Sequence, residues 1–182
     1  MVKDAVSARY AEALFDVARQ EGKLDAVVEQ LQAIAGLIRD HDDLRKLLLN
    51  PGVESTDKIR VLDRLLGSSW SADVRAFVQV VIDMDRASYL VEMSGALGDL
   101  ADVERRVLRV TVRTAYPLAV PLRQRLTQWL EQQERASVVL TEEVDALLIG
   151  GIQVVMGHRV FDGSLRTQLS ALRQRLKRVR VH

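Results

Sequence analysis

The sequence predicts a mainly α-helical protein with a smaller α/β part: an N-terminal six-helix bundle followed by a small C-terminal α/β domain. Apolar residues recur at every third or fourth position as far as Arg106, which is the period of helices with one buried face. From Val107 onward, apolar and polar residues alternate, which is the period of a strand. A chain of 182 residues can hold two small domains, so we place them at residues 1–106 and 107–182.

Six amphipathic helices are expected in the first domain. The first helix carries on or beside one face Tyr10, Ala11, Leu14, Phe15, Val17 and Ala18. The apolar faces of the other five are, in order, Leu24, Val27, Val28, Leu31, Ile34, Ala35 and Ile38; Leu44, Leu47 and Leu48; Ile59, Leu62, Leu65 and Leu66; Val74, Phe77, Val78, Val81 and Met84; and Leu90, Met93, Leu97, Leu100 and Val103.

Certain residues indicate where these helices begin and end. Gly67 is expected to close the fourth helix, and Pro51 disfavours helical geometry at Asn50 and so ends the third. Ser55 and Ser71 are expected N-caps, because a hydroxyl oxygen there can accept a hydrogen bond from a free backbone N–H of the first turn.

Strands and helices alternate in the expected C-terminal domain. Strands are predicted near residues 107–113, 138–140, 149–156 and 159–161. A helix that begins near Pro117 and Pro121 carries Leu118, Leu122, Leu126, Trp129 and Leu130. The last helix has an apolar face that we expect to pack on the sheet, formed by Leu165, Leu169, Leu172 and Leu176. Its other side is basic, with Arg173, Arg175, Lys177 and Arg178.

A glycine pair, Gly150 and Gly151, opens the third predicted strand. Adjacent glycines suit a strand only where the backbone bends or is closely approached. A phosphate loop would need a lysine and a hydroxyl residue after the glycines, where Ile152 and Gln153 stand. A dinucleotide-binding turn would need glycines that open a helix. The pair therefore predicts a structural bend.

No group of side chains has the spacing of a catalytic site or a metal site. The chain has no cysteine, which removes disulfides and thiol chemistry, and His41, His158 and His182 have no second ligand at metal-binding spacing. A nucleophile elbow has glycines two positions before and two positions after its serine, and Ser164 has Asp162 and Arg166 there. The sequence predicts no catalytic residue, metal or cofactor.

Other short patterns have structural explanations. Asp162, Gly163 and Ser164 are expected to turn the chain and cap the last helix. Asp83 and Asp85 cannot face one another on a helix, and Glu142 and Glu143 are expected in a turn.

Charge is distributed unevenly between the domains. Residues 1–106 hold 14 Lys and Arg against 19 Asp and Glu, a net −5, and residues 107–182 hold 12 against 6, a net +6. Such an imbalance is typical of two surfaces that meet different partners. The basic last helix keeps open an alternative, a nucleic-acid-binding accessory protein.

Apolar runs far shorter than the roughly 18 residues of a membrane span predict a cytosolic protein.

The order of several short motifs resembles the delta subunit family of bacterial F-type ATP synthase, which includes the mitochondrial oligomycin-sensitivity-conferring protein. These motifs extend along nearly the whole chain: Ala8-Arg9-Tyr10-Ala11-Glu12-Ala13-Leu14-Phe15, Asn50-Pro51 with Lys58, Phe77 with Arg86, Ala115-Tyr116-Pro117-Leu118, Val144-Asp145, Leu148-Ile149-Gly150-Gly151 and Asp162-Gly163-Ser164. Ala146 stands where the family often has proline, and His158 where a small acidic or amide residue is common.

This resemblance implies a non-catalytic stator subunit with one copy per complex, peripheral on the cytoplasmic face of the cell membrane and not inserted in it. The bundle would bind the N-terminal helix of an alpha subunit between its first and fifth helices, and the α/β domain would bind the C-terminus of the b subunits. Carried over, the alpha-binding residues are Tyr10, Ala11, Leu14, Phe15, Ala18, Val74, Phe77, Val78 and Val81. We expect Phe15→Asp to weaken this binding without unfolding the domain, and we expect no nucleic-acid binding.

Overall fold

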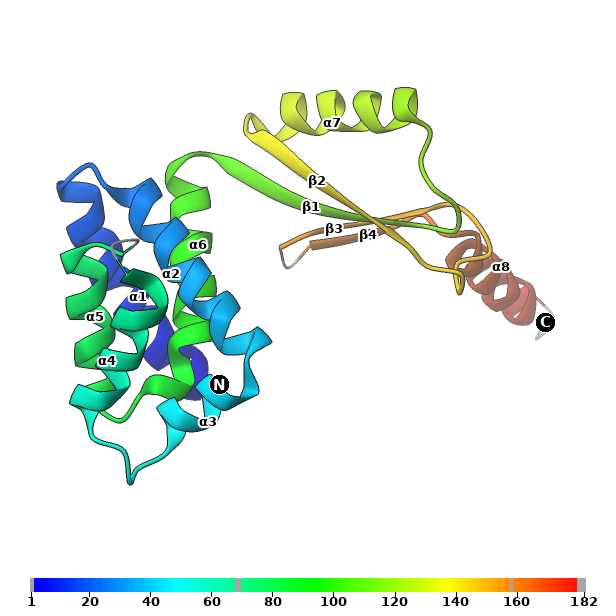
Figure 1. Cartoon of the computed structure of the whole chain (residues 1–182). Helices are drawn as coiled ribbons and strands as arrows, with labels where there is room; N and C mark the ends of the chain where they lie inside the picture. The colour runs from blue at the N-terminus through cyan, green and yellow to red at the C-terminus, as the bar shows by residue number, and fades with distance from the viewer. Residues whose placement is uncertain (1, 68–69, 158, 180–182) are drawn as a thin grey trace. The chain divides into compact units, whose positions relative to one another are not determined.

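The chain divides into two compact units in a computed structural model that describes residues 2–67, 70–157 and 159–179 (Figure 1). Unit 1 comprises Met1–Glu104 and unit 2 comprises Arg105–His182. The division falls two residues before the boundary expected from the sequence. Each unit has its own apolar core, and together they make a mainly helical protein with one small sheet.

Unit 1 is built from helices joined by short turns. Its described elements are α1 (Val2–Gln20), α2 (Leu24–Asp40), α3 (Asp42–Leu49), α4 (Ser55–Leu66), α5 (Ala72–Asp83), the 3-10 helix η2 (Ala87–Tyr89) and α6 (Leu90–Glu104).

The helix α6 occupies the centre of the unit 1 core. It packs against α1 and α2, and one of its faces is wholly buried, with 0% exposure at Leu90, Met93, Leu97 and Ala101. A Cβ at Gly98 would lie 3.3 Å from the side-chain amide nitrogen of Gln32 in α2. The side chain of Gln32 therefore lies directly over Gly98 in the contact between α2 and α6.

Helix ends in unit 1 confirm three of the predictions and correct one. α3 ends at Leu49, directly before Asn50 and Pro51, as expected. Ser71 caps α5, because its Oγ accepts a hydrogen bond from the backbone N–H of Val74 at 3.4 Å. Gly67 ends α4 with a φ of +57°, which glycine adopts most easily. Ser55 is not an N-cap: Glu54 takes that position with an extended backbone, and Ser55 is the first residue of α4.

Four residues assigned to apolar helix faces of unit 1 are exposed instead, and among them Val17 is 48% and Leu65 is 57% exposed. Met84 follows the last residue of α5 and is 61% exposed, and Val103 is 77% exposed one residue before the end of α6. All four lie in the last turn of a helix or directly after it, where the apolar period continues although the side chains face solvent.

Unit 2 is a four-stranded sheet with two helices. Its elements are β1 (Val107–Thr114), α7 (Val120–Glu134), β2 (Ser137–Val144), β3 (Ile152–Met156), β4 (Arg159–Asp162) and α8 (Leu165–Val179). The strand order is β2-β1-β3-β4. β1 pairs in parallel with β2, to which α7 connects it, and antiparallel with β3, and β3 pairs antiparallel with β4.

One face of the sheet carries the unit 2 core. The alternation predicted for β1 is confirmed: Val110 and Val112 are buried at 1% and 0% exposure, while Arg109 and Arg113 are exposed. Leu130 of α7 belongs to this core, and α7 lies over the sheet (Figure 1). Leu122 and Trp129, predicted on the same side of α7, are 53% and 57% exposed, because they lie about 80° and about 100° around the helix from Leu130 at 100° per residue.

Two further strand predictions are corrected. β3 begins at Ile152 and not at Ile149, since the glycine pair forms a turn before it. Glu142 and Glu143 lie in β2 and not in a turn. Glu142 accepts a hydrogen bond from the backbone N–H of Leu118, and Glu143 accepts one from Nε of Arg113 on the neighbouring strand at 2.7 Å.

Candidate functional site

The helices α1 and α5 are antiparallel neighbours in unit 1. At one end, Nζ of Lys23, just after α1, lies 3.4 Å from a carboxylate oxygen of Asp73 in the first turn of α5. At the other end, Nη1 of Arg86, just after α5, donates a 2.8 Å hydrogen bond to the hydroxyl of Tyr10. These contacts bring together the two helices that carry the predicted alpha-binding residues.

Most of the predicted alpha-binding residues lie in the unit 1 core. Seven of the nine have at most 9% exposure: Ala11, Leu14, Phe15, Ala18, Val74, Val78 and Val81. Tyr10 and Phe77 are half-buried. Phe15 is only 9% exposed, so a carboxylate introduced there would lose most of its hydration, although Arg19 lies beside it. We therefore expect Phe15→Asp to destabilise the unit as well as to weaken binding.

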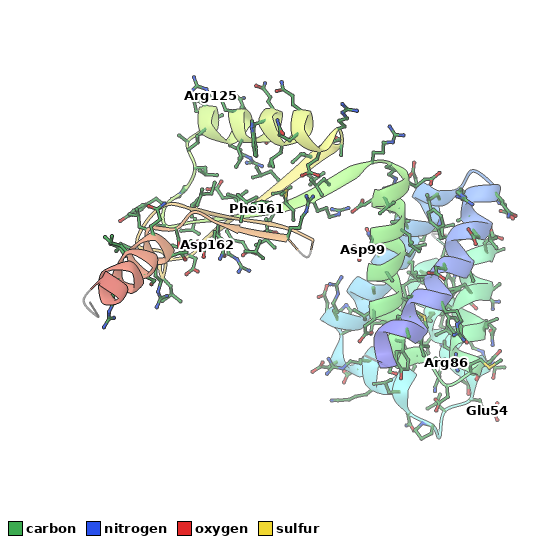
Figure 2. The ribbon with its side chains drawn as sticks, turned by 180° about the vertical axis from the view of Figure 1, so that it is seen from behind. Glu54, Arg86, Asp99, Arg125, Phe161 and Asp162 are labelled. Atoms are coloured by element: carbon green, nitrogen blue, oxygen red, sulfur yellow. The ribbon has the colours of Figure 1, made fainter. Side chains whose placement is uncertain are left out.

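Tyr10, Phe77 and Arg86 form a small aromatic cluster at the boundary between core and solvent. The rings of Tyr10 and Phe77 meet edge to face, with centroids 6.4 Å apart and planes at 68°. The guanidinium carbon of Arg86, which is labelled in Figure 2, lies 5.2 Å from the centre of the Tyr10 ring. Arg86 holds the ring by a cation–π contact as well as by the hydrogen bond to its hydroxyl.

Exposed apolar side chains extend this cluster along both helices. Ala13 and Val17 follow Tyr10 by three and seven positions, and Val80 and Met84 follow Phe77 by the same intervals, so each set shares one helix face. Val17 and Val80 are 48% exposed and Met84 is 61% exposed. We call Tyr10, Ala13, Val17, Phe77, Val80 and Met84 the α1–α5 surface.

Four members of the α1–α5 surface were not among the predicted binding residues. The periodicity of the sequence places Val17 and Met84 on the buried faces of their helices, and only the structure separates the buried residues from their exposed neighbours one position away. A signal in the sequence is that Val17 follows Tyr10, and Met84 follows Phe77, by seven residues, which is two turns of a helix.

In unit 2, the glycine pair forms a tight turn against the start of α8. A Cβ at Gly151 would lie 2.5 Å from the carbonyl oxygen of Gly163, and the φ of Gly151 is +85°, so both space and backbone geometry require glycine. The carbonyl oxygen of Gly150 accepts a 2.9 Å hydrogen bond from the N–H of Leu165. The pair is therefore a structural bend, as predicted, and it attaches α8 to the sheet.

Asp162 and Ser164 organise the first turn of α8, as predicted. Oγ of Ser164 accepts a hydrogen bond from the N–H of Thr167 at 3.3 Å. The carboxylate of Asp162 accepts hydrogen bonds from the N–H of Ser164 and the hydroxyl of Thr167, both at 2.9 Å. Hydrogen bonds from Ser164, through its side chain and its backbone, and from Thr167 lower the pKa of Asp162 below its ordinary value. The Asp162-Gly163-Ser164 step thus fixes where α8 begins.

The apolar face of α8 is exposed, contrary to the prediction that it packs on the sheet. Leu165, Leu169 and Leu172 are 45%, 56% and 53% exposed, and α8 extends away from the strands after its first turn (Figure 1). We call these three residues the α8 surface. Arg173 is exposed; the side chains of Leu176, Arg175, Lys177 and Arg178, like His158 and His182, lie outside the described part of the chain.

Comparisons with known proteins match nearly the whole chain. A family model for the ATP synthase delta (OSCP) subunit matches residues 6–176. The chain belongs to this family. ATP synthase subunit delta of Myxococcus xanthus is 34% identical over 180 residues, which cover 97% of this chain and 99% of the relative. The same subunit of Beijerinckia indica is 35% identical over 176 residues, covering 96% of this chain and 93% of the relative.

The fold of the family extends to more distant relatives. A chain in the mitochondrial ATP synthase hexamer of Toxoplasma gondii superposes with a TM-score of 0.74, covering 93% of this chain and 96% of that one, at 20% identity. At this level of identity the match shows that the fold is shared. Members of the family are non-catalytic structural subunits, and the comparisons give no support to the nucleic-acid-binding alternative.

The described residues form neither a metal-binding cluster nor a membrane-spanning helix. Among the described residues, no group of three or more His, Asp or Glu side chains is arranged to hold a metal ion. None of the helices in the described ranges combines the length and the apolar character needed to cross a bilayer.

Proposed function

We propose that the chain is a non-catalytic stator subunit of an F1Fo ATP synthase, which links the alpha subunits of the catalytic head to the b subunits of the peripheral stalk. Its membership of the delta (OSCP) subunit family carries this proposal. Under this proposal, residues 1–106 form a six-helix bundle that binds the N-terminus of an alpha subunit. Residues 107–182 form an α/β domain that binds the C-terminus of the b subunits. One copy per complex would sit peripherally on the cytoplasmic face of the cell membrane.

The task of such a subunit is mechanical. Rotation of the central stalk exerts torque on the catalytic head, and a stator must oppose that torque so that rotation changes the nucleotide sites instead of turning the head. A link of this kind needs a stable docking surface at each end. Each unit offers one made of exposed apolar side chains on ordered helices, the α1–α5 surface and the α8 surface.

The α1–α5 surface suits an amphipathic helix as its partner. Such a helix binds through apolar side chains at intervals of three, four and seven residues, laid along an apolar strip. Val17, Val80 and Met84 supply exposed apolar area, and the Tyr10–Phe77 pair, held by Arg86, supplies a fixed aromatic base. The buried residues of α1 and α5 act indirectly, by setting the spacing of the two helices.

The first test measures binding of a synthetic peptide with the N-terminal sequence of the alpha subunit to the full chain by calorimetry. Val80→Asp places a charge on the α1–α5 surface, about one turn along α5 from Phe77, and we expect it to weaken binding by roughly tenfold or more. Because Val80 is 48% exposed, the fold should survive, which circular dichroism can verify.

The matched control is Val103→Asp, which puts the same charge on the 77% exposed Val103 of α6, outside this surface. It should leave the affinity for the peptide unchanged. Equal affinities of the two variants would contradict the assigned surface, even if the wild-type chain binds the peptide.

A further inference from the structure

A pocket of about 260 Å³ lies between α2, α3, η2 and α6 of unit 1, formed by residues other than those of the α1–α5 surface. Its floor is apolar, with Ile38, Leu48 and Ala87 buried and Val91 half-buried. The volume is many times the roughly 30 Å³ share of one water molecule and just below that of typical ligand pockets, which begin at about 300 Å³. It suits a small molecule with a hydrocarbon part.

Charged side chains at this pocket favour a negatively charged head group. Arg39 from α2 and Arg45 from α3 both line it. Nε of Arg39 donates to the carbonyl oxygen of Ala35 in its own helix at 3.3 Å. That bond orients the guanidinium group, and among the described residues Arg39 has no carboxylate partner. Its two terminal nitrogens can therefore bind a carboxylate in the bidentate geometry that arginine favours.

Two acidic residues restrict the charge of the ligand. Asp42 already pairs with Arg45 at 2.8 Å, which leaves Arg39 as the main anchor. Glu92 from α6 lines the same pocket, and its charge would repel a second negative group on the ligand. A single carboxylate on an aliphatic chain satisfies all of these features.

We propose that this pocket binds a medium-chain aliphatic monocarboxylate, with its carboxylate on Arg39 and its hydrocarbon chain over Leu48, Ala87 and Val91. The exposed side chain of Leu49, at 46%, stands among the lining residues and can close over the chain. This site does not depend on the stator function, because none of its lining residues belongs to the α1–α5 surface or the α8 surface.

The test is a titration of the full chain with sodium octanoate, followed by NMR of side-chain methyl groups. We expect saturable shifts of the Leu48, Ala87 and Val91 methyls. 1-Octanol is the matched neutral probe, with the same chain and no charge, and it should bind several-fold more weakly.

Two substitutions at exposed residues should act in opposite directions. Arg39→Gln removes a charge-assisted hydrogen bond and should weaken octanoate binding by roughly tenfold without affecting octanol. Glu92→Gln removes a repulsive charge and should strengthen octanoate binding a few-fold. Arg64→Gln, at an exposed arginine of α4 outside the pocket, is the control and should change nothing.

Three results would each overturn the proposal: octanol binding as tightly as octanoate, Arg39→Gln behaving like Arg64→Gln, or no saturable shift of the three methyls. All three variants alter exposed side chains, so a folded protein is available for each measurement.

Discussion

At the scale of single residues, Gly151 is the position in unit 2 where the structure most strictly requires glycine. We predict that Gly151→Ala destabilises unit 2 by about 2 to 5 kcal/mol, the sum of a left-handed backbone cost and an overpacking cost. The new Cβ would lie 2.5 Å from the carbonyl oxygen of Gly163, at a residue whose φ is +85°. Hydrogen exchange of the β1 and β3 amides measures this loss.

Gly157 is a matched control for that prediction. Its φ is +55°, but a Cβ there would meet no atom within 4 Å. Gly157→Ala should therefore cost only the backbone part, about 1 kcal/mol. If both variants lost the same stability, the close approach at Gly151 would not be what requires glycine.

Residue patterns predicted the turn chemistry of unit 2 better than they predicted exposed surfaces. Gly150, Gly151 and Ser164 have the structural roles expected from the sequence, because turn and cap preferences depend on the local backbone. By contrast, the sequence could not separate Val17, which is 48% exposed, from its neighbour Ala18, which is 2% exposed. Adjacent residues differ by 100° around a helix, and only tertiary packing decides where the core ends.

At the scale of elements, the two predicted serine caps give a test of what a cap contributes. We predict that Ser71→Ala lowers the stability of unit 1 by about 1 kcal/mol, the usual effect of losing an N-cap side chain. Oγ of Ser71 accepts from the N–H of Val74, and the alanine would leave this donor without that partner. Urea unfolding can be followed by the fluorescence of Trp70, which is 9% exposed in the unit 1 core.

Ser55→Ala is the comparison, because Ser55 lies inside α4 and its side chain does not cap the helix. We expect a change within about 0.5 kcal/mol. An equal loss from the two substitutions would show that hydroxyl capping does not explain the effect at Ser71.

Helix periodicity predicted which segments form helices, but it did not predict which surface covers the apolar face of each helix. The apolar spacing in α8 is that of an amphipathic helix, and the prediction assumed that its face packs on the sheet. The structure leaves Leu165, Leu169 and Leu172 exposed, and the backbone of the Gly150–Gly151 turn contacts α8 at Leu165, the first residue of the helix. An amphipathic pattern shows that a face is suited to burial and leaves open whether its partner belongs to the same chain.

At the scale of the whole molecule, the separation into two units is what suits the chain to connect two partners. The change of period at Val107 and the charges of −5 and +6 indicated this separation from the sequence, and the structure divides the chain at residues 104 and 105. These patterns could not predict the partners, because neither periodicity nor net charge identifies the sequence that a surface binds. The ordered motifs indicated the family, and the comparisons confirmed it.

If each unit binds its own partner, the two binding activities must be separable by mutation while the link requires both. We predict that Val80→Asp reduces capture of the alpha subunit by roughly tenfold or more and retains capture of b, and that Leu169→Asp does the reverse. Both residues are about half exposed, at 48% and 56%, so neither charge would be buried in a core. In a pull-down with tagged alpha subunit, the b subunit can be recovered only through this chain. We therefore expect recovery of b when the wild-type chain is present and much less when either variant replaces it. Undiminished recovery of b through either variant, or loss of both partners from one substitution, would contradict a linker with one docking surface in each unit.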